Sequence, residues 1–97
     1  MEILKASVAG TMESSDIMIT LEPGSNGVEI ELKSIVEGQY GRQIRSVIAS
    51  TLSELNVKSA KLSAVDKGAL DCTIQARVKT AVYRAAGESP QEWRISV

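Results

Sequence analysis

Four segments of the chain carry the apolar pattern of β-strands, and two carry that of helices. Residues 3–12 are small and apolar and predict a first strand. In residues 17–22, and again in residues 28–33, apolar and polar positions alternate, as in strands with one buried face. Proline, glycine and asparagine occupy residues 23–27 between them, and these residue types favour tight turns. We therefore expect the second and third strands to pair as an antiparallel hairpin.

From residue 37 onward the apolar positions recur every three or four residues. They are Tyr40, Ile44, Val47, Ile48, Thr51, Leu52 and Leu55. This spacing predicts an amphipathic helix over residues 37–55, and Asn56 can end it in the left-handed conformation. Residues 57–65 then alternate again and predict a short strand with small inward residues.

Residues 70–78 taken alone fit either a strand or a helix, because their apolar positions satisfy both periods. We favour a helix, since the stripe that starts at Leu70 continues unbroken to Ala85 and Gly87 supplies a stop. The single cysteine, Cys72, is expected to be a small buried residue of this helix rather than a reactive thiol.

The element order β-β-β-α-β-α predicts an α+β fold, in which two helices cover one face of a small, mainly antiparallel sheet. Glu29, Glu31 and Lys33 would then point to solvent or to a partner. We expect residues 1–87 to form the domain. Residues 88–97 lack a clear period and predict a tail, either mobile or docked through Trp93.

Composition excludes several classes of function. The 97 residues are 43% hydrophobic and 24% charged, as in a single globular domain. A net charge of -1 argues against nucleic acid or a membrane as partner, and without a signal peptide the cytoplasm is the default location. There is no histidine, which removes the commonest general base and most zinc sites. We therefore expect neither a free-standing enzyme nor a metal protein.

A small polar segment, Ala-Gly-Thr-Met-Glu-Ser-Ser-Asp at residues 9–16, lies between the first two predicted strands. Two adjacent hydroxyls stand between two carboxylates, and no histidine is present to activate them. One interpretation is a polar hairpin turn whose side chains satisfy local backbone groups. The other is an accessible serine at the tip of the hairpin with a role of its own.

Residues 8–16 resemble the N-terminal motif of the citrate lyase acyl carrier proteins, the gamma subunits of that enzyme. The likeness extends, in order and at matching spacing, through Gln39-Tyr40-Gly41, Ile44-Arg45, the run from Asp66 to Cys72, the run from Ala76 to Ala81, and Arg84-Ala85. It covers residues 5–87, and the tail carries no part of it.

The resemblance implies that the serine after Gly-Thr-x-Glu, which is Ser14, carries a covalent prosthetic group. The group is 2'-(5''-triphosphoribosyl)-3'-dephospho-CoA, attached through a phosphodiester by a separate transferase. Family members often have glycine after that serine, whereas this chain has Ser15, which makes the turn less permissive. Ser15 is the second candidate for the attachment residue. Glu13 and Asp16 are expected to be solvated or recognised by the transferase.

The resemblance further implies a non-catalytic carrier subunit. Its arm would hold acetyl and citryl thioesters while the alpha (transferase) and beta (lyase) subunits cleave citrate to acetate and oxaloacetate. Tethering raises the effective concentration of the acyl group at each site. A carrier for malonate decarboxylation and an unmodified protein-interaction module are the alternatives. We expect the basic residues of the two helices to be solvated, and some of them to contact the arm or the larger subunits. They are Arg42, Arg45, Arg77, Lys79 and Arg84.

Overall fold

The computed structural model describes residues 1–35 and 37–87. In chain order these residues form β1 (Ser7–Gly10), β2 (Ile17–Pro23), β3 (Val28–Ser34), α1 (Glu37–Glu54), β4 (Ala60–Asp66) and α2 (Asp71–Ala86). This is the predicted order of strands and helices. The predicted tail, with Trp93, lies outside the described residues.

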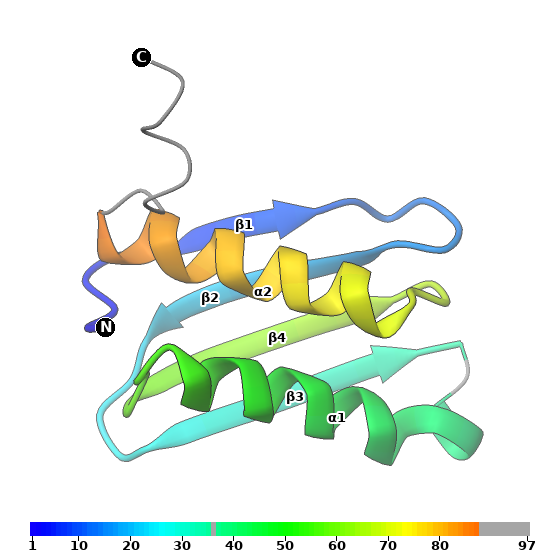
Figure 1. Cartoon of the computed structure of the whole chain (residues 1–97), viewed down its shortest axis with the longest axis horizontal. Helices are drawn as coiled ribbons and strands as arrows, with labels where there is room; N and C mark the ends of the chain where they lie inside the picture. The colour runs from blue at the N-terminus through cyan, green and yellow to red at the C-terminus, as the bar shows by residue number, and fades with distance from the viewer. Residues whose placement is uncertain (36, 88–97) are drawn as a thin grey trace.

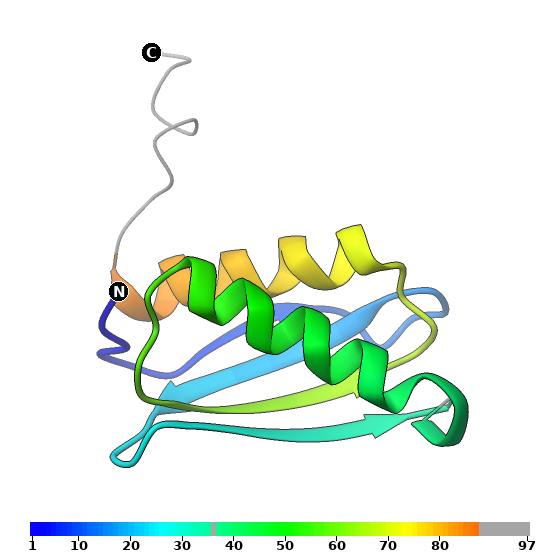
Figure 2. The ribbon, with the colours of Figure 1, turned by 60° about the horizontal axis from the view of Figure 1, so that its bottom comes forward.

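The four strands form one sheet in the order β1-β2-β4-β3 (Figure 1). The pairs β1–β2 and β2–β4 are antiparallel, while β3 and β4 are parallel. Both helices lie on the same face of the sheet, α2 above β1 and β2 and α1 above β3 (Figure 2). The predicted α+β fold with two helices on one face of a mainly antiparallel sheet is confirmed, and the sheet is mixed.

The predicted hairpin between the second and third strands is wrong. β4 lies between β2 and β3, and β3 pairs only with β4. The burial of the strands explains this order. On β4, Ala60, Leu62 and Ala64 are all buried, whereas on β3 only Leu32 is buried and Val28 is 39% exposed. The more apolar strand takes the central position, and α1 makes the crossover that parallel strands need.

Residues 24–27, which we call the crossover turn, carry the chain past the beginning of β4 to the edge of the sheet. A Cβ atom at Gly24 would lie 2.8 Å from the backbone nitrogen of Ala60. The backbone nitrogen of Ala60 also donates a hydrogen bond of 3.1 Å to the carbonyl oxygen of Gly27. The glycine-rich sequence therefore allows a close crossing of two backbones, where local turn signals had suggested a hairpin.

The core lies between the sheet and the helices. Its helical part consists of Ile44, Val47, Ile48, Thr51 and Leu52 from α1, and Ile74, Val78, Ala81, Val82 and Ala85 from α2. Tyr40 was expected on the buried stripe of α1 but is 51% exposed. The first turn of α1 extends beyond the part of the helix that packs on the sheet, which accounts for this exposure (Figure 2).

Two further apolar residues near the start of α2 are exposed. Leu70 precedes α2 as its N-cap residue and is 71% exposed. Cys72 is exposed and was wrongly expected in the core. At about 100° per residue, Cys72 lies about 200° around the helix from the buried Ile74, so it faces away from the sheet.

The boundaries of the elements differ modestly from those predicted. β1 is shorter than residues 3–12, and β4 begins at Ala60 rather than at residue 57. The helix-ending residues behave as predicted: Asn56 and Gly87 both have positive φ, 56° and 73°. No helix among the described residues is long and apolar enough to cross a bilayer.

One end of the molecule brings together several connections. The loop between β1 and β2, the turn between β4 and α2, and the first turns of both helices all lie at this end (Figure 1). The segment with the two adjacent serines is therefore beside other loops, and it does not extend alone into solvent.

Candidate functional site

Residues 11–16, which we call the serine loop, connect β1 to β2 around a tight turn. The backbone nitrogen of Asp16 donates a hydrogen bond of 3.2 Å to the carbonyl oxygen of Glu13, which closes a four-residue turn. Ser14 and Ser15 are its two central residues, and both are exposed. Ser15 has a φ of 65°, as the third residue of a type II turn does. Glycine suits that position best, so Ser15 holds a strained conformation.

Gly10, the last residue of β1, sets the start of the serine loop. Its φ is 98°, and a Cβ atom placed on it would lie 1.9 Å from the carbonyl oxygen of Ile17. No side chain fits there without moving the backbone of β2. Glycine at this position therefore allows the chain to leave β1 and return directly into β2.

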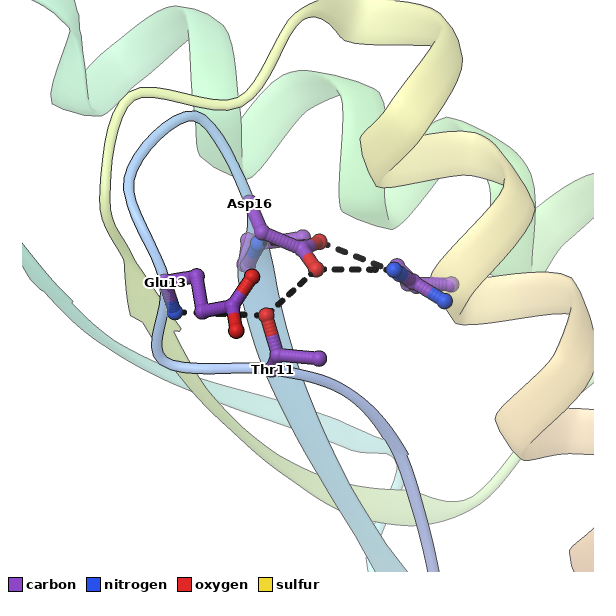
Figure 3. A network of polar contacts seen from close by, with 5 residues as sticks. Thr11, Glu13 and Asp16 are labelled. Atoms are coloured by element: carbon purple, nitrogen blue, oxygen red, sulfur yellow. Dashed lines mark hydrogen bonds and ion pairs between the residues drawn. The ribbon is translucent and has the colours of Figure 1, made fainter.

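An ion pair joins the serine loop to α2 (Figure 3). The guanidinium of Arg77 donates from Nε to Oδ1 of Asp16 at 3.0 Å and from Nη2 to Oδ2 at 2.7 Å. The hydroxyl of Thr11 also donates to Oδ2, at 2.7 Å, and accepts a bond of 3.2 Å from the backbone nitrogen of Glu13. The backbone nitrogen of Ile17 donates to Oδ1 at 2.7 Å. Asp16 thus links both ends of the loop to one helix.

This environment changes the electrostatics of the loop. The hydrogen bonds from Arg77, followed by that from Thr11, hold the pKa of the Asp16 carboxyl well below its usual range. The same pair raises the pKa of the Arg77 guanidinium. The expectation that Asp16 and Arg77 are solvated is therefore wrong, since they form a two-point pair with side-chain exposures of 13% and 38%. Glu13 is exposed, as expected.

The backbone of the serine loop is also fixed to the turn that follows β4. The nitrogen of Ser15 donates to the carbonyl oxygen of Lys67, and the nitrogen of Lys67 donates to the carbonyl oxygen of Asp16, both at 2.8 Å. The turn itself is shaped by Asp66. This buried carboxylate accepts hydrogen bonds from the backbone nitrogens of Gly68 and Ala69.

Ser14 differs from its neighbours in having no such constraint. Among residues 1–35 and 37–87, its hydroxyl has no hydrogen-bond partner, and its side chain is exposed at the tip of the turn. Within residues 1–35 and 37–87, no base is hydrogen-bonded to it, whereas a serine nucleophile usually has one. The site can present a hydroxyl to another enzyme.

In the described part of the chain, none of the other basic candidates forms a hydrogen bond or ion pair with this loop. The guanidinium groups of Arg45 and Arg84 donate to the carbonyl oxygens of Ile30 and Val8, respectively. Arg42 and Lys79 are exposed, as predicted. Within the described part of the chain, no group of three or more histidine, cysteine, aspartate or glutamate residues is placed to hold a metal ion.

Sequence reasoning missed the pairing of Asp16 with Arg77. Both residues lie in segments that resemble the carrier family, but they are 61 positions apart. Arg77 lies off the buried stripe of α2, which by itself indicates only a polar helix face. Nothing in either local pattern identifies the partner.

Comparison with known proteins gives consistent matches over most of the chain. A family model described as the malonate decarboxylase delta subunit (MdcD) matches residues 4–85. A citrate lyase acyl carrier protein of Streptococcus uberis is 55% identical over 94 residues, which cover 97% of this chain and 93% of that protein. One from Latilactobacillus sakei is 54% identical over 93 residues, covering 96% and 92% of the two chains.

A solved structure gives the same fold. A chain of a Pseudomonas malonate decarboxylase hetero-tetramer, crystallised in complex with malonate, matches with a TM-score of 0.75 over 86% of each chain. The sequences are only 18% identical, so this likeness concerns the fold. The mixed sheet with two helices on one face is thus found in an experimental structure as well.

Proposed function

Because the chain belongs to the family that contains the citrate lyase acyl carrier proteins and the malonate decarboxylase delta subunits, we propose that it is the acyl carrier subunit of a citrate lyase. It carries acetyl and citryl groups during the cleavage of citrate to acetate and oxaloacetate. The matches at 54–55% identity over nearly whole chains favour citrate lyase over malonate decarboxylase.

The proposed attachment residue is Ser14. The observation that carries this proposal is an exposed hydroxyl, free of hydrogen bonds to the described residues, at the tip of a turn that is fixed on both sides. The positive φ of Ser15 adds support, since it explains why glycine suits the position after the attachment serine. Ser15 is the second candidate, because its hydroxyl is also exposed and has no hydrogen-bond partner among the described residues. Unlike Ser14, it holds the loop to Lys67 through its backbone nitrogen.

The proposed group is 2'-(5''-triphosphoribosyl)-3'-dephospho-CoA, joined to Ser14 by a phosphodiester. When bound, it supplies a thiol that carries acyl groups as thioesters. The surroundings of Ser14 fit such a group, because the tip of the turn is open to solvent and the charge of Asp16 is balanced by Arg77. Glu13 is the exposed anion nearest in sequence, and it repels a phosphate and so favours an arm directed away from the loop.

In this proposal the chain itself catalyses nothing. Its contribution is to hold Ser14 in one place while the long arm reaches the active sites of other subunits, which makes each delivery effectively intramolecular. The proposed partners are the alpha (transferase) and beta (lyase) subunits and the transferase that attaches the group. Residues 1–87 would act as the carrier domain, and the cytoplasm is the predicted location.

Reconstitution tests the proposal. The chain is co-expressed with the prosthetic-group transferase and purified, the thiol of the attached group is acetylated with acetic anhydride, and the acetyl form is mixed with the alpha and beta subunits of a citrate lyase. We expect acetate and oxaloacetate to form from citrate, and no carbon dioxide to form from malonate with the catalytic subunits of a malonate decarboxylase. Chain expressed without the transferase is the matched control and should be inactive.

Two results would contradict the proposal. Equal citrate cleavage with the unmodified chain would show that no arm is required, and the chain would then be an interaction module. Activity with malonate but not with citrate would assign the carrier to the decarboxylase.

A further inference from the structure

A cleft of about 440 Å³ lies beside the serine loop, between α1 and the turn after β4. We call it the α1–α2 cleft. Tyr40, Gln43 and Ile44 of α1 form one wall, and Asp66 and residues 68–71 form the other. Its size is within the range of small-ligand sites. Nothing in the proposed function uses it so far.

The cleft and the proposed attachment point share the turn after β4. Lys67 accepts the hydrogen bond of 2.8 Å from the nitrogen of Ser15, and the next two residues, Gly68 and Ala69, line the cleft. The Cα atoms of Ser14 and Gly68 each lie within about 3.8 Å of one of the two atoms that this bond joins. The two Cα atoms are therefore within roughly 10 Å of each other. A group bonded to Ser14 needs only a short linker to enter the cleft.

Two of the exposed side chains that line the cleft, those of Tyr40 and Leu70, have large apolar surfaces. Tyr40 is 51% exposed and Leu70 is 71% exposed. A tyrosine ring that is half open to solvent offers a face on which a planar ring can stack. The walls therefore suit a flat ligand with apolar faces.

The polar groups of the cleft restrict its ligand further. The carboxylate oxygens of Asp66 are occupied by backbone and hydroxyl donors within the protein. Asp71 accepts a hydrogen bond of 3.0 Å from the amide of Gln43, and both side chains are exposed. Two carboxylates repel phosphate. An amide and a carboxylate together match the ring nitrogen and amino group of adenine.

From this geometry we propose that the α1–α2 cleft binds the adenine ring of the prosthetic group, with Tyr40 stacking on it and Gln43 and Asp71 at its polar edge. The proposal rests on the proposed function, because it takes the adenine to be linked to Ser14. Adenine is the flat, uncharged part of the arm, and it is closer to the phosphodiester than the thiol is. Holding the adenine would leave the thiol end free to reach other subunits.

Nuclear magnetic resonance tests the proposal. The chain is labelled with ¹⁵N and prepared with and without the transferase, and intact mass first establishes whether the group is attached. In the modified chain we expect shifts of the amide signals of Tyr40, Gly68 and Ala69. Free 3'-dephospho-CoA titrated into the unmodified chain should shift the same signals, whereas 4'-phosphopantetheine, which lacks the purine, should not.

Variants separate stacking from general binding. We expect Tyr40→Ala to weaken 3'-dephospho-CoA binding about tenfold, since stacking on an aromatic ring contributes that much per base. Tyr40→Leu keeps the apolar area but lacks the aromatic ring, and it should weaken binding as well. Ser50→Ala, at an exposed position on the same helix, is the matched control and should bind as the wild type does.

Three outcomes would overturn the proposal. In a modified chain, shifts confined to residues 11–16 would show that the arm stays clear of the cleft. Equal shifts with 4'-phosphopantetheine would assign the cleft to the thiol end. Shifts that arise only on addition of the alpha or beta subunit would make the cleft a protein contact. A chain whose mass is not raised by the transferase would contradict the proposed function instead, and the titration with free 3'-dephospho-CoA would still test the cleft.

Discussion

The two connections on either side of β2 have opposite characters. The serine loop enters β2 without glycine or proline, yet an ion pair to α2, two backbone bonds to Lys67 and a steric requirement at Gly10 fix it in place. The crossover turn follows Pro23 and contains two glycines, and it is held by one backbone bond, from Ala60 to Gly27, and by the close approach of Gly24 to Ala60. The loop with the weaker local signal is the more constrained, because its constraints come from distant parts of the chain.

This difference separates two uses of a loop. The crossover turn only has to carry the chain over the start of β4. The serine loop has to present one hydroxyl in a defined place. Glu13, Ser15 and Asp16 on either side of Ser14 are fixed by hydrogen bonds, whereas Ser14 forms none with the described residues. Matched substitutions in the two loops measure this difference in constraint.

The largest difference is expected between Gly10, before the serine loop, and Gly27, in the crossover turn, both of which have positive φ. Gly10→Ala would force its Cβ against the carbonyl oxygen of Ile17, and we expect it to lower the free energy of unfolding by about 3 kcal/mol or more, from strain and overpacking together. Gly27→Ala, with no atom within 4 Å of its Cβ, should cost only about 1 kcal/mol. Urea denaturation measures both. Equal losses would show that the start of the serine loop is no tighter than the crossover turn.

The ion pair is expected to have an intermediate effect. Arg77→Met keeps most of the apolar stem and removes the charge, and we expect a loss of about 1–2 kcal/mol, since the pair is partly exposed and screened by solvent. A double-mutant cycle with Asp16→Asn measures the coupling. Lys79→Met, at an exposed position on the same helix, is the control and should change stability little. A coupling energy near zero would show that the ion pair between Asp16 and Arg77 does not stabilise the serine loop.

The depressed pKa of Asp16 gives the same pair a pH dependence. Because the carboxyl binds protons more weakly in the folded chain, the pair contributes fully above the unfolded pKa of about 4. That contribution is lost as the pH falls below this value toward the folded pKa. Wild type should therefore lose more stability than Asp16→Asn between pH 6 and pH 3. Parallel curves of the two proteins would contradict the assignment.

The smallest effect is expected at Ser15. Ser15→Gly relieves the strain of a positive φ but makes the unfolded chain more flexible, so we expect a net gain of roughly 0.5 kcal/mol. Modification at Ser14 should continue. A clear loss of stability, measured by urea denaturation, would mean that the side chain of Ser15 makes a contribution that outweighs its strain.

Periodicity predicted most of the fold, because each element has a clear local pattern. The alternation of Ile17, Ile19 and Leu21 and the stripe of α2 from Ile74 to Ala85 predicted both the element types and their buried faces. The pairing of β3 with β4 was not predictable in this way. It depends on which strand buries more apolar surface and on a crossover through α1, and neither is a property of residues 23–27.

The candidate site was predictable only in part. The Gly-Thr-x-Glu-Ser motif indicated Ser14, and the structure places this residue at an exposed tip. The partner of Asp16 was not predictable, because Arg77 looks like any polar residue of a helix face. Cys72 was misplaced because its residue type, and the apolar alternation of residues 70–78, favoured burial, whereas in the helix that these residues form it lies off the buried stripe.

Intact mass after co-expression with the prosthetic-group transferase tests the central claim most directly. We predict that wild type and Ser15→Ala gain the mass of the phosphodiester-linked group and that Ser14→Ala gains none. All three should unfold at similar urea concentrations, because both serines are exposed. Modification of Ser14→Ala to the level of wild type, or an unmodified wild-type chain in an active citrate-cleaving complex, would contradict the account.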